Sequence, residues 1–217
     1  MNKNEQFVIT INREVGTGGR TVGRKLAEKL CVKYCDKAVI DGLTQKFGLT
    51  PERIEEIKAQ KKSWWNNINN YYQTLVNSAS QPMEAEVKLD STIMFETEKR
   101  ILQELATHSS CVVAGRSGFF VFRDHPNRLS ILIQASMDFR VKRVANKQHI
   151  TSEEARKIIE KVDKMRENYV NKYTKSSRYD TRNYDLVITA DGKTEDEIVD
   201  IILRYIGQYK TDSFTYL

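Results

Sequence analysis

Three glycines within four residues, Gly16, Gly18 and Gly19, are the first feature of the chain that could do chemistry. They follow the β-branched, apolar residues 7–12 and precede the amphipathic residues 21–30. Glycine allows positive φ angles and a close approach of the backbone to a ligand. The N–H groups at a helix N-terminus attract anions through their unpaired donors and the helix dipole. A strand, a glycine-rich bend and a helix in this order therefore predict a phosphate-binding loop rather than an ordinary turn.

This phosphate loop, residues 16–21, departs from the strict Walker pattern GxxxxGK[ST]. Gly16, Gly18 and Thr21 are in register with the nucleotide-kinase form of the loop, but Gly19 stands at the lysine position. Thr21 is expected to offer its hydroxyl to Mg²⁺. The charge of the missing lysine would then come from a nearby arginine, because a guanidinium group binds phosphate through two donors. The candidates are Arg13, Arg20 and Arg24.

A dinucleotide-binding fingerprint, GxGxxG, is the competing interpretation of the same glycines. Gly16 and Gly18 match it, but Thr21 stands at the third glycine position. Asp36, near the end of a second strand-like segment, stands where a ribose-binding acid is expected. Several polar residues separate the first strand from the glycines, whereas the fingerprint follows its strand at once. The dinucleotide interpretation is therefore the weaker of the two.

The elements that would position the loop alternate between strands and helices along the whole chain. β-branched apolar runs predict strands, and apolar residues at helical spacing predict helices. Such alternation favours an α/β fold, a three-layer sandwich in which helices cover both faces of a mostly parallel sheet. Strands are expected at residues 7–12, 32–36, 110–115, 129–134 and 185–189, and helices at 21–30, 92–108, 136–146, 151–173 and 194–209. A further helix is expected to start at residues 50–51, and Thr151 with Glu154 has the spacing of a capping box.

Ligands of such sheets bind where the strands end at their carboxyl edge. Three loops there carry glycines with polar or charged residues: residues 13–19, 115–118 and 189–192. Arg116 directly follows a buried strand, so we expect it to act on phosphate. Arginines on the predicted helices fit phosphate binding and a plain surface role equally well. These are Arg140, Arg143 and Arg166.

The composition indicates one domain, residues 1–217, with 40% hydrophobic residues and a net charge of +6. We expect a helical insertion at residues 45–90 on the acceptor side and a lid-like segment at residues 147–182. Aromatic residues of the insertion are expected to pack in a core or at a homodimer face rather than to stack on a base. They are Trp64, Trp65, Tyr71 and Tyr72.

Several classes of protein are excluded at this stage. The chain starts with the polar residues MNKNEQ, so we expect no secretory signal. It has no apolar run of about 20 residues, so we expect no membrane-spanning helix. Cys31, Cys35 and Cys111 have no CxxC spacing and are expected to be buried free thiols in a reducing cytoplasm. The scattered histidines predict no metal site made of protein ligands alone. The basic charge suits a polyanion, but no nucleic-acid-binding motif is present, so nucleotides are the expected partners.

Segments of the chain, in order, resemble the cytidylate kinase-like family: VITINREVGTGGRTVGRKLAEKL, VVAGRSGFFVF, LSILIQASMDFRVKRV and DKMRENYVNKY with NYDLVIT. The resemblance covers most of the chain outside residues 45–90. It implies a five-stranded nucleoside monophosphate kinase fold of the P-loop superfamily. It also implies transfer of the γ-phosphate of ATP to CMP or a related monophosphate, with Mg²⁺. The acceptor stays open, because the base-binding Ser and Arg of true cytidylate kinases are not recognisable after Asp36.

The resemblance also implies the site. Donor phosphates would be held by Gly16, Thr17, Gly18, Gly19, Arg20, Thr21 and Arg143, with Thr21 as the metal ligand. The acceptor side would comprise Arg13, Asp36, Arg116, Ser117 and Asp163, and true cytidylate kinases have aspartate where Ser117 stands. Charge on the transferring group would be neutralised by Arg20, Arg116, Arg140 and Arg166, which suits phosphoryl transfer. The alternative function is a non-catalytic nucleotide or anion sensor that keeps the loop without the lysine.

Overall fold

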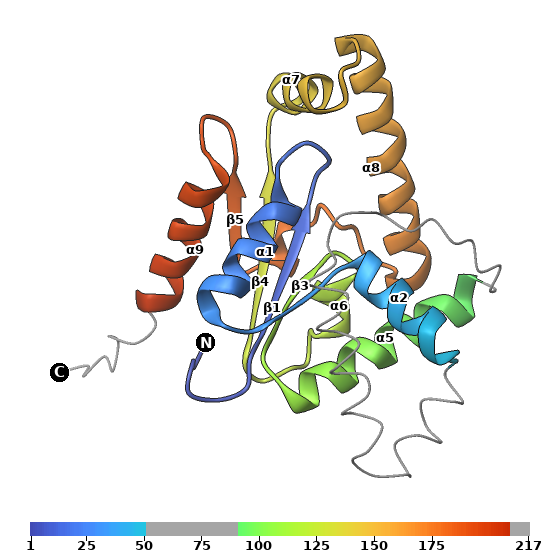
Figure 1. The fold of residues 1–217 in the computed structure, drawn as a ribbon, viewed down its shortest axis with the longest axis vertical. Coiled ribbons are helices and arrows are strands. Elements are labelled where there is room, and N and C mark those ends of the chain that lie inside the picture. Colours follow the sequence, from blue (N-terminus) through green and yellow to red (C-terminus); the bar gives the residue numbers. More distant parts are fainter. Residues whose placement is uncertain (51–90, 209–217) are drawn as a thin grey trace.

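A computed structural model describes residues 1–50 and 91–208 of the chain, and these form a five-stranded parallel sheet (Figure 1). The strand order is β2-β3-β1-β4-β5, so β1 lies at the centre with Ile9 paired to Val112 on one side and Leu129 on the other. The strands are β1 Val8–Arg13, β2 Lys33–Cys35, β3 Cys111–Ala114, β4 Arg128–Gln134 and β5 Leu186–Thr189. All five predicted strands are confirmed, to within one residue at each end.

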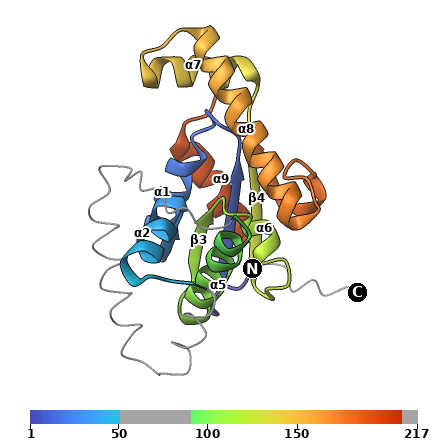
Figure 2. The same cartoon turned by 90° about the vertical axis from the view of Figure 1, so that its right-hand side faces the viewer.

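Helices cover both faces of the sheet, as Figures 1 and 2 show. They are α1 Gly19–Leu30, α2 Lys37–Phe47, α5 Ser91–His108, α6 Gly118–Val121, α7 Met137–Gln148, α8 Ser152–Thr174 and α9 Glu195–Gln208, with a short 3-10 turn at Thr181–Asn183. One apolar core joins α1 and α9 to the sheet, and a second joins α2, α5 and α6 to its other face. The predicted three-layer α/β sandwich is therefore confirmed. In Figure 1, α7 and the upper part of α8 stand beyond the carboxyl edge of the strands.

Alternation along β1 explains why two cores form. Successive side chains of a strand point to opposite faces. Ile9 and Ile11 enter the core shared with α1 and α9, whereas Val8 enters the core shared with α2 and α5. Between them the buried Thr10 hydroxyl donates to the Ser130 hydroxyl at 3.0 Å, so neither polar group is left without a partner. β1 is thus fixed from both sides, and its C-terminal end is held rigidly where the phosphate loop begins.

Residues 37–47 form α2, although the sequence analysis predicts no element there. Asp36 caps this helix: its carboxylate accepts a hydrogen bond from the Val39 N–H at 3.2 Å. Gly48 ends the helix with a φ of 57°. The predicted insertion 45–90 thus begins inside α2. Residues 51–90, with Pro51 and the four aromatic residues Trp64, Trp65, Tyr71 and Tyr72, lie outside the described residues.

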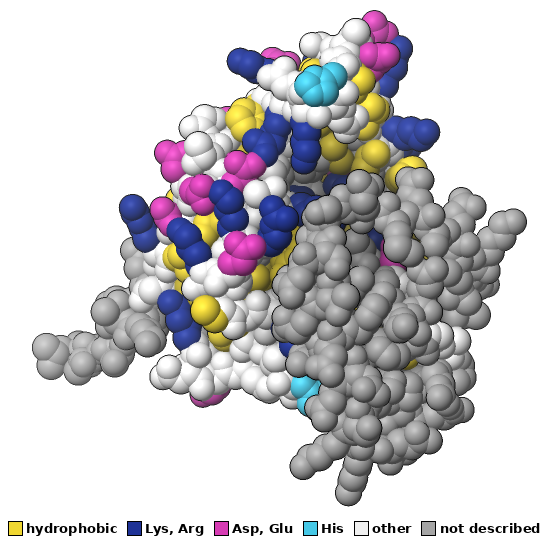
Figure 3. All heavy atoms as spheres, in the orientation of Figure 1, with side chains coloured by type: hydrophobic (Ala, Val, Ile, Leu, Met, Phe, Trp, Pro, Cys, Tyr) yellow, Lys and Arg dark blue, Asp and Glu magenta, His cyan; other side chains and the backbone are white. Residues whose placement is uncertain are grey.

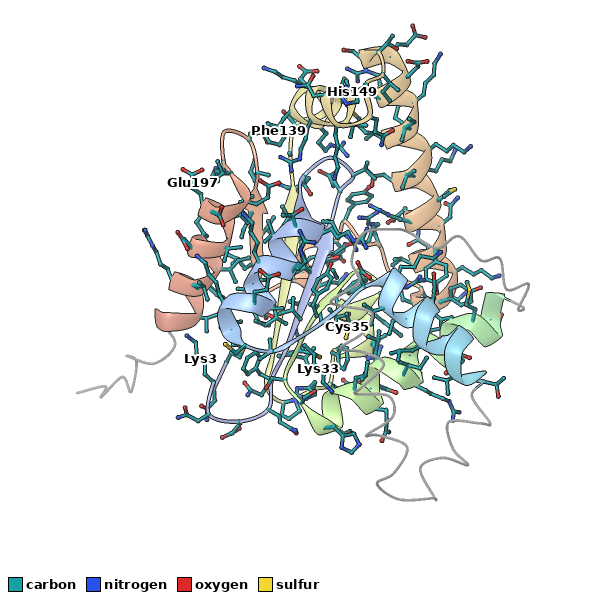
Figure 4. All side chains as sticks on the ribbon, in the orientation of Figure 1. Lys3, Lys33, Cys35, Phe139, His149 and Glu197 are labelled. Carbon is teal, nitrogen blue, oxygen red and sulfur yellow. The ribbon has the colours of Figure 1, made fainter. Side chains whose placement is uncertain are left out.

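The three cysteines carry free thiols. Cys35 and Cys111 are buried as expected, and Cys35 is labelled in the interior in Figure 4. Burial raises the pKa of both thiols, that of Cys111 to about 12. The expectation is wrong for Cys31, which is exposed because it forms the left-handed C-cap of α1 at a φ of 55°. Across residues 1–50 and 91–208, no helix has the length and apolarity needed to cross a bilayer.

The predicted capping box of α8 is confirmed and leads to a test of local stability. The Thr151 hydroxyl accepts from the Glu154 N–H at 3.2 Å, and the Glu154 carboxylate accepts from the Thr151 N–H at 2.9 Å. Thr151→Ala is expected to lower the free energy of unfolding by about 1 kcal/mol in urea denaturation. Lys161→Ala, on the exposed face of the same helix, should change it by less than about 0.5 kcal/mol. Equal values for the two variants would contradict the capping role.

Candidate phosphate-binding site

The phosphate loop joins β1 to α1 with backbone angles that only glycine adopts readily. Gly16 has a φ of 88° and Gly18, the N-cap of α1, a φ of 77°. As a glycine, the N-cap residue Gly18 has no side chain with which to cap α1. A helix start without a capping side chain leaves N–H donors for another acceptor. The loop therefore has the geometry of an anion-binding helix N-terminus.

Hydrogen bonds tie the start of the loop to two neighbouring elements. The Thr17 hydroxyl donates to the Glu14 carbonyl at 2.9 Å and so closes the bend. The Glu14 carboxylate accepts from the Ala135 N–H at 3.0 Å, just beyond the end of β4. The Val15 N–H donates to the Asp163 carboxylate at 3.2 Å. The loop is therefore attached both to the C-terminal end of β4 and to α8.

Helix α7 packs directly on the loop at Gly16. A Cβ added there would lie 2.9 Å from both the Cβ and the carbonyl oxygen of Arg140. Figure 4 marks the two ends of this helix, with Phe139 in the first turn and His149 as the C-cap. At Gly18 an added Cβ would meet the ion pair of Arg143 and Glu195. The structure thus brings Arg140 and Arg143 next to the loop, and each is paired with a protein carboxylate.

Asp163 is the centre of a buried ionic cluster beside the loop. Its carboxylate lies 2.6 Å from Arg140 Nη1, 3.5 Å from Arg178 Nη1 and 3.8 Å from Arg166 Nη1. Arg178 is 1% exposed and also donates to the Arg13 carbonyl and to Asn12 Oδ1. Burial lowers the pKa of Arg166, and the neighbouring Arg178 lowers it further. Three guanidinium groups therefore share the Asp163 carboxylate, and the Glu14 carboxylate lies 3.8 Å from Arg140 Nε as well.

The loop after β3 places Arg116 in an unusual conformation. Gly115, Arg116 and Ser117 have consecutive φ values of 82°, 53° and 51°, and non-glycine residues in this region are strained. Arg116 Nη2 lies 2.7 Å from the buried Glu98 carboxylate, which also accepts from the Tyr169 hydroxyl at 2.8 Å. Burial raises the pKa of Glu98, and the charge of Arg116 opposes the rise. The Ser117 hydroxyl is buried and finds no acceptor or donor among the described residues.

Arg20 and Asp36, both predicted site residues, bind each other. Arg20 Nε lies 2.7 Å from the Asp36 carboxylate, and the Arg20 side chain is 64% exposed. Asp36 also caps α2, so it is held between that helix and α1. Thr21 lies in the first turn of α1, and the register of the nucleotide-kinase loop predicts the metal-binding hydroxyl at this residue. The roles assigned to these three residues stay predictions.

The structure adds residues that the sequence analysis missed. They are Glu14, Glu98, Arg178 and Glu195. Arg178 stands in the polar segment SSRYD without periodicity, and its burial depends on distant β1 residues. Glu98 and Glu195 look like ordinary acids of amphipathic helices. Only Glu14 had a signal, since it lies within the glycine-rich segment itself.

The surface around the loop is basic. Figure 3 shows Lys and Arg side chains gathered, among acidic ones, over α1 and between α1 and α7. A groove of about 320 Å³ adjoins the Asp163 cluster and is lined by Met137, Arg140, Ile159, Glu160, Asp163, Lys164, Glu167 and Tyr179. Within the described part of the chain, no three His, Cys, Asp or Glu side chains are grouped so as to hold a metal ion by themselves.

Two solved structures share this fold. A protein of Eubacterium ventriosum matches with a TM-score of 0.65 and 24% identity, over 93% of this chain and 99% of that one. A shikimate kinase from Acinetobacter baumannii, solved with shikimate, matches with a TM-score of 0.50 and 16% identity, over 94% and 95%. At these identities the likeness shows the fold alone, which is that of the P-loop kinases.

Sequence relatives lead to the family. A cytidylate kinase from Sulfolobus acidocaldarius is 26% identical over 201 residues, 92% of this chain and 94% of that protein. An S-adenosylmethionine-dependent nucleotide dehydratase from Lacinutrix mariniflava is 25% identical over 202 residues, 91% of this chain, but the chain spans only 35% of its length. Residues 8–191 match the profile of the cytidylate kinase-like family, which together with the fold supports a kinase. The chain belongs to the cytidylate kinase-like family.

Proposed function

We propose that the protein is a nucleoside monophosphate kinase that transfers the γ-phosphate of ATP to CMP or a related monophosphate. One observation carries this proposal: a helix N-terminus without a side-chain cap faces a concentration of arginines at the carboxyl edge of a parallel sheet. Phosphoryl transfer requires mainly that two polyanions be positioned and their charge be stabilised. The names of both sequence relatives refer to nucleotides, which supports a nucleotide substrate.

The roles of the residues follow from their positions. The N–H groups of residues 16–21 would bind the donor phosphates, and Arg143 would assist from α7. Arg140 and Arg166 would neutralise charge on the transferring group, and Arg116 would orient the acceptor phosphate from the neighbouring loop. The Thr21 hydroxyl fits as a ligand of Mg²⁺, which would neutralise phosphate charge when bound. The free thiols favour a reducing compartment, and we place the protein in the cytoplasm.

A panel assay tests the function. ATP consumption is measured with CMP, UMP, AMP, GMP and dCMP in turn, in the presence of Mg²⁺. Turnover with at least one monophosphate is expected. Tight binding of ATP without turnover on the whole panel would instead indicate the sensor. The absence of both turnover and ATP binding would refute both functions.

Arg116→Ala is expected to lower kcat/KM for the best acceptor by about 100- to 1,000-fold, because it removes a positive charge from the proposed acceptor side. The same change leaves the buried Glu98 unpaired, so folding must be checked separately. Arg116→Ala/Glu98→Gln removes that buried charge and should restore the melting temperature without restoring activity. Arg123→Ala, an exposed arginine paired with Asp124, is the matched control. Activity restored by the double variant would assign Arg116 a structural role only.

A further inference from the structure

We propose that Arg13 supplies the space-filling side chain and the charge of the lysine missing from the phosphate loop, and that Gly19 is its obligatory counterpart. When the Walker pattern GxxxxGK[ST] is laid on the loop with its lysine at Gly19, its first glycine falls on Arg13. The two residue types have therefore exchanged positions. The inference that Arg13 supplies the charge of the lysine rests on the proposed function. The inference that its side chain fills the space beside Gly19 does not.

The space argument comes from the contacts of Gly19. A Cβ added at Gly19 would lie 2.6 Å from Arg13 Cβ and 2.9 Å from Arg13 Cγ, closer than such atoms approach in proteins. Gly19 is not among the glycines with positive φ, so its backbone does not demand glycine. The stem of the Arg13 side chain is what excludes a side chain at Gly19.

The direction of Arg13 places its charge between two loops. Arg13 is the last residue of β1, and its stem passes beneath the first residue of α1. Its guanidinium group then lies against Gly115, where an added Cβ would overlap it. Gly115 follows β3, the strand next to β1, and precedes Arg116. The guanidinium group therefore lies between the proposed donor site and the proposed acceptor site, where a transferred phosphoryl group would pass.

The charge of Arg13 lacks a protein counterion in the described part of the chain, where no carboxylate forms an ion pair with it. Its electrostatic neighbours include two further cations, Arg166 and Arg178, which lower its pKa, and Tyr34 and Asp36, which raise it. Burial lowers the pKa of Arg13 to about 10, so the group still carries its charge at neutral pH. Arg13 is half-buried, and a cation in such a position beside other cations is stabilised by a bound anion.

The two other candidate arginines are already paired. Arg20 lies 2.7 Å from the buried Asp36 carboxylate and points to the surface. Arg24 lies on the exposed side of α1, with Glu28 at 3.9 Å one turn later. The side chain that lies nearest the Cβ position of Gly19 is that of Arg13. Among the three arginines that could replace the lysine, the geometry points to Arg13.

A four-member cycle tests the exchange: the wild type, Arg13→Gly, Gly19→Lys and Arg13→Gly/Gly19→Lys, all as the full chain. The melting temperature is measured without ligand, and the affinities for ATP and for inorganic tripolyphosphate are measured by calorimetry with Mg²⁺. Gly19→Lys should lower the melting temperature, because its side chain overlaps Arg13. Arg13→Gly should weaken the binding of both ligands by about 10- to 100-fold. The double variant, which restores the lysine-type loop, should recover most of the affinity and of the melting temperature. Arg24→Ala, the control, should bind both ligands within about twofold of the wild type.

The two readouts separate this inference from the proposed function. If the wild type binds neither ATP nor tripolyphosphate, the kinase function fails, and the melting temperatures still test whether the side chains at positions 13 and 19 compete for the same space. Additive effects of the two substitutions on the melting temperature would show that they do not compete. If the wild type binds ATP and Arg13→Gly binds it equally well, nucleotide binding by the protein stands and Arg13 is not the missing cation.

Discussion

The Asp163→Ala variant is expected to unfold with a free energy about 3–5 kcal/mol lower than that of the wild type. Removal of this carboxylate leaves Arg140 and Arg178 buried without their shared counterion. It also removes the acceptor of the Val15 N–H at the start of the phosphate loop. A buried charge that loses its partner keeps the full cost of desolvation. The loss is measured by urea denaturation, as the shift of the midpoint at constant slope.

Two further variants separate charge from hydrogen bonding at this position. Asp163→Asn keeps an oxygen that can accept from the Val15 N–H but removes the negative charge, so it should lose nearly as much stability as the alanine variant. Asp138→Ala removes a carboxylate that is 94% exposed on α7 and pairs with Arg156 at 3.5 Å. That control should change the free energy of unfolding by less than about 0.5 kcal/mol. A stable Asp163→Asn variant would show that hydrogen bonding, not charge, holds the cluster.

Gly18→Val is expected to weaken ATP binding by about a hundredfold or more. The φ of 77° at the N-cap of α1 is one that a β-branched residue adopts only under strain. Its Cβ would also lie 3.0 Å from Arg143 and Glu195, on the side of the helix start where an anion would lie. The affinity is measured by calorimetry with Mg²⁺, and circular dichroism confirms that the variant is folded.

Gly48→Val is the matched control for backbone strain. Gly48 has a φ of 57°, and an added Cβ would find no atom of the described residues within 4 Å. This variant should lose stability through the strained backbone alone and keep the ATP affinity of the wild type. Wild-type affinity in a folded Gly18→Val variant would count against the phosphate loop as the nucleotide site.

Much of the fold could be predicted because its signals are local. The strands β1, β3 and β4 contain short runs rich in apolar and β-branched residues, and this length and composition favour a strand over a helix. The cap of α8 was visible as Thr151 and Glu154 at fixed spacing. Helix α2 escaped prediction because its capping residue, Asp36, was interpreted only as a possible ligand contact. One polar side chain can serve as a cap and as a site residue, and the sequence does not say which.

The candidate site was predictable where the backbone defines it. Gly16 and Gly18 predicted the loop, because both have positive φ angles, which glycine adopts readily and which are typical of a tight bend. Side-chain partners across the fold carried no such signal. Arg178 donates a hydrogen bond to Asn12, which is 166 positions away in the sequence. Arg13 lies next to Gly19 because of the shape of the bend between them, which the sequence does not specify. Long-range contacts of polar residues therefore required the structure.

Cys31 is a suitable site for attaching a fluorescent label. It is the exposed thiol, since Cys35 and Cys111 are buried and carry raised pKa values. It sits at the far end of α1, twelve residues or roughly 18 Å along the helix axis from the phosphate loop. A maleimide fluorophore should thus label a single position, at a distance from any bound nucleotide. Such a conjugate would report tumbling or energy transfer to a fluorescent nucleotide without blocking its access.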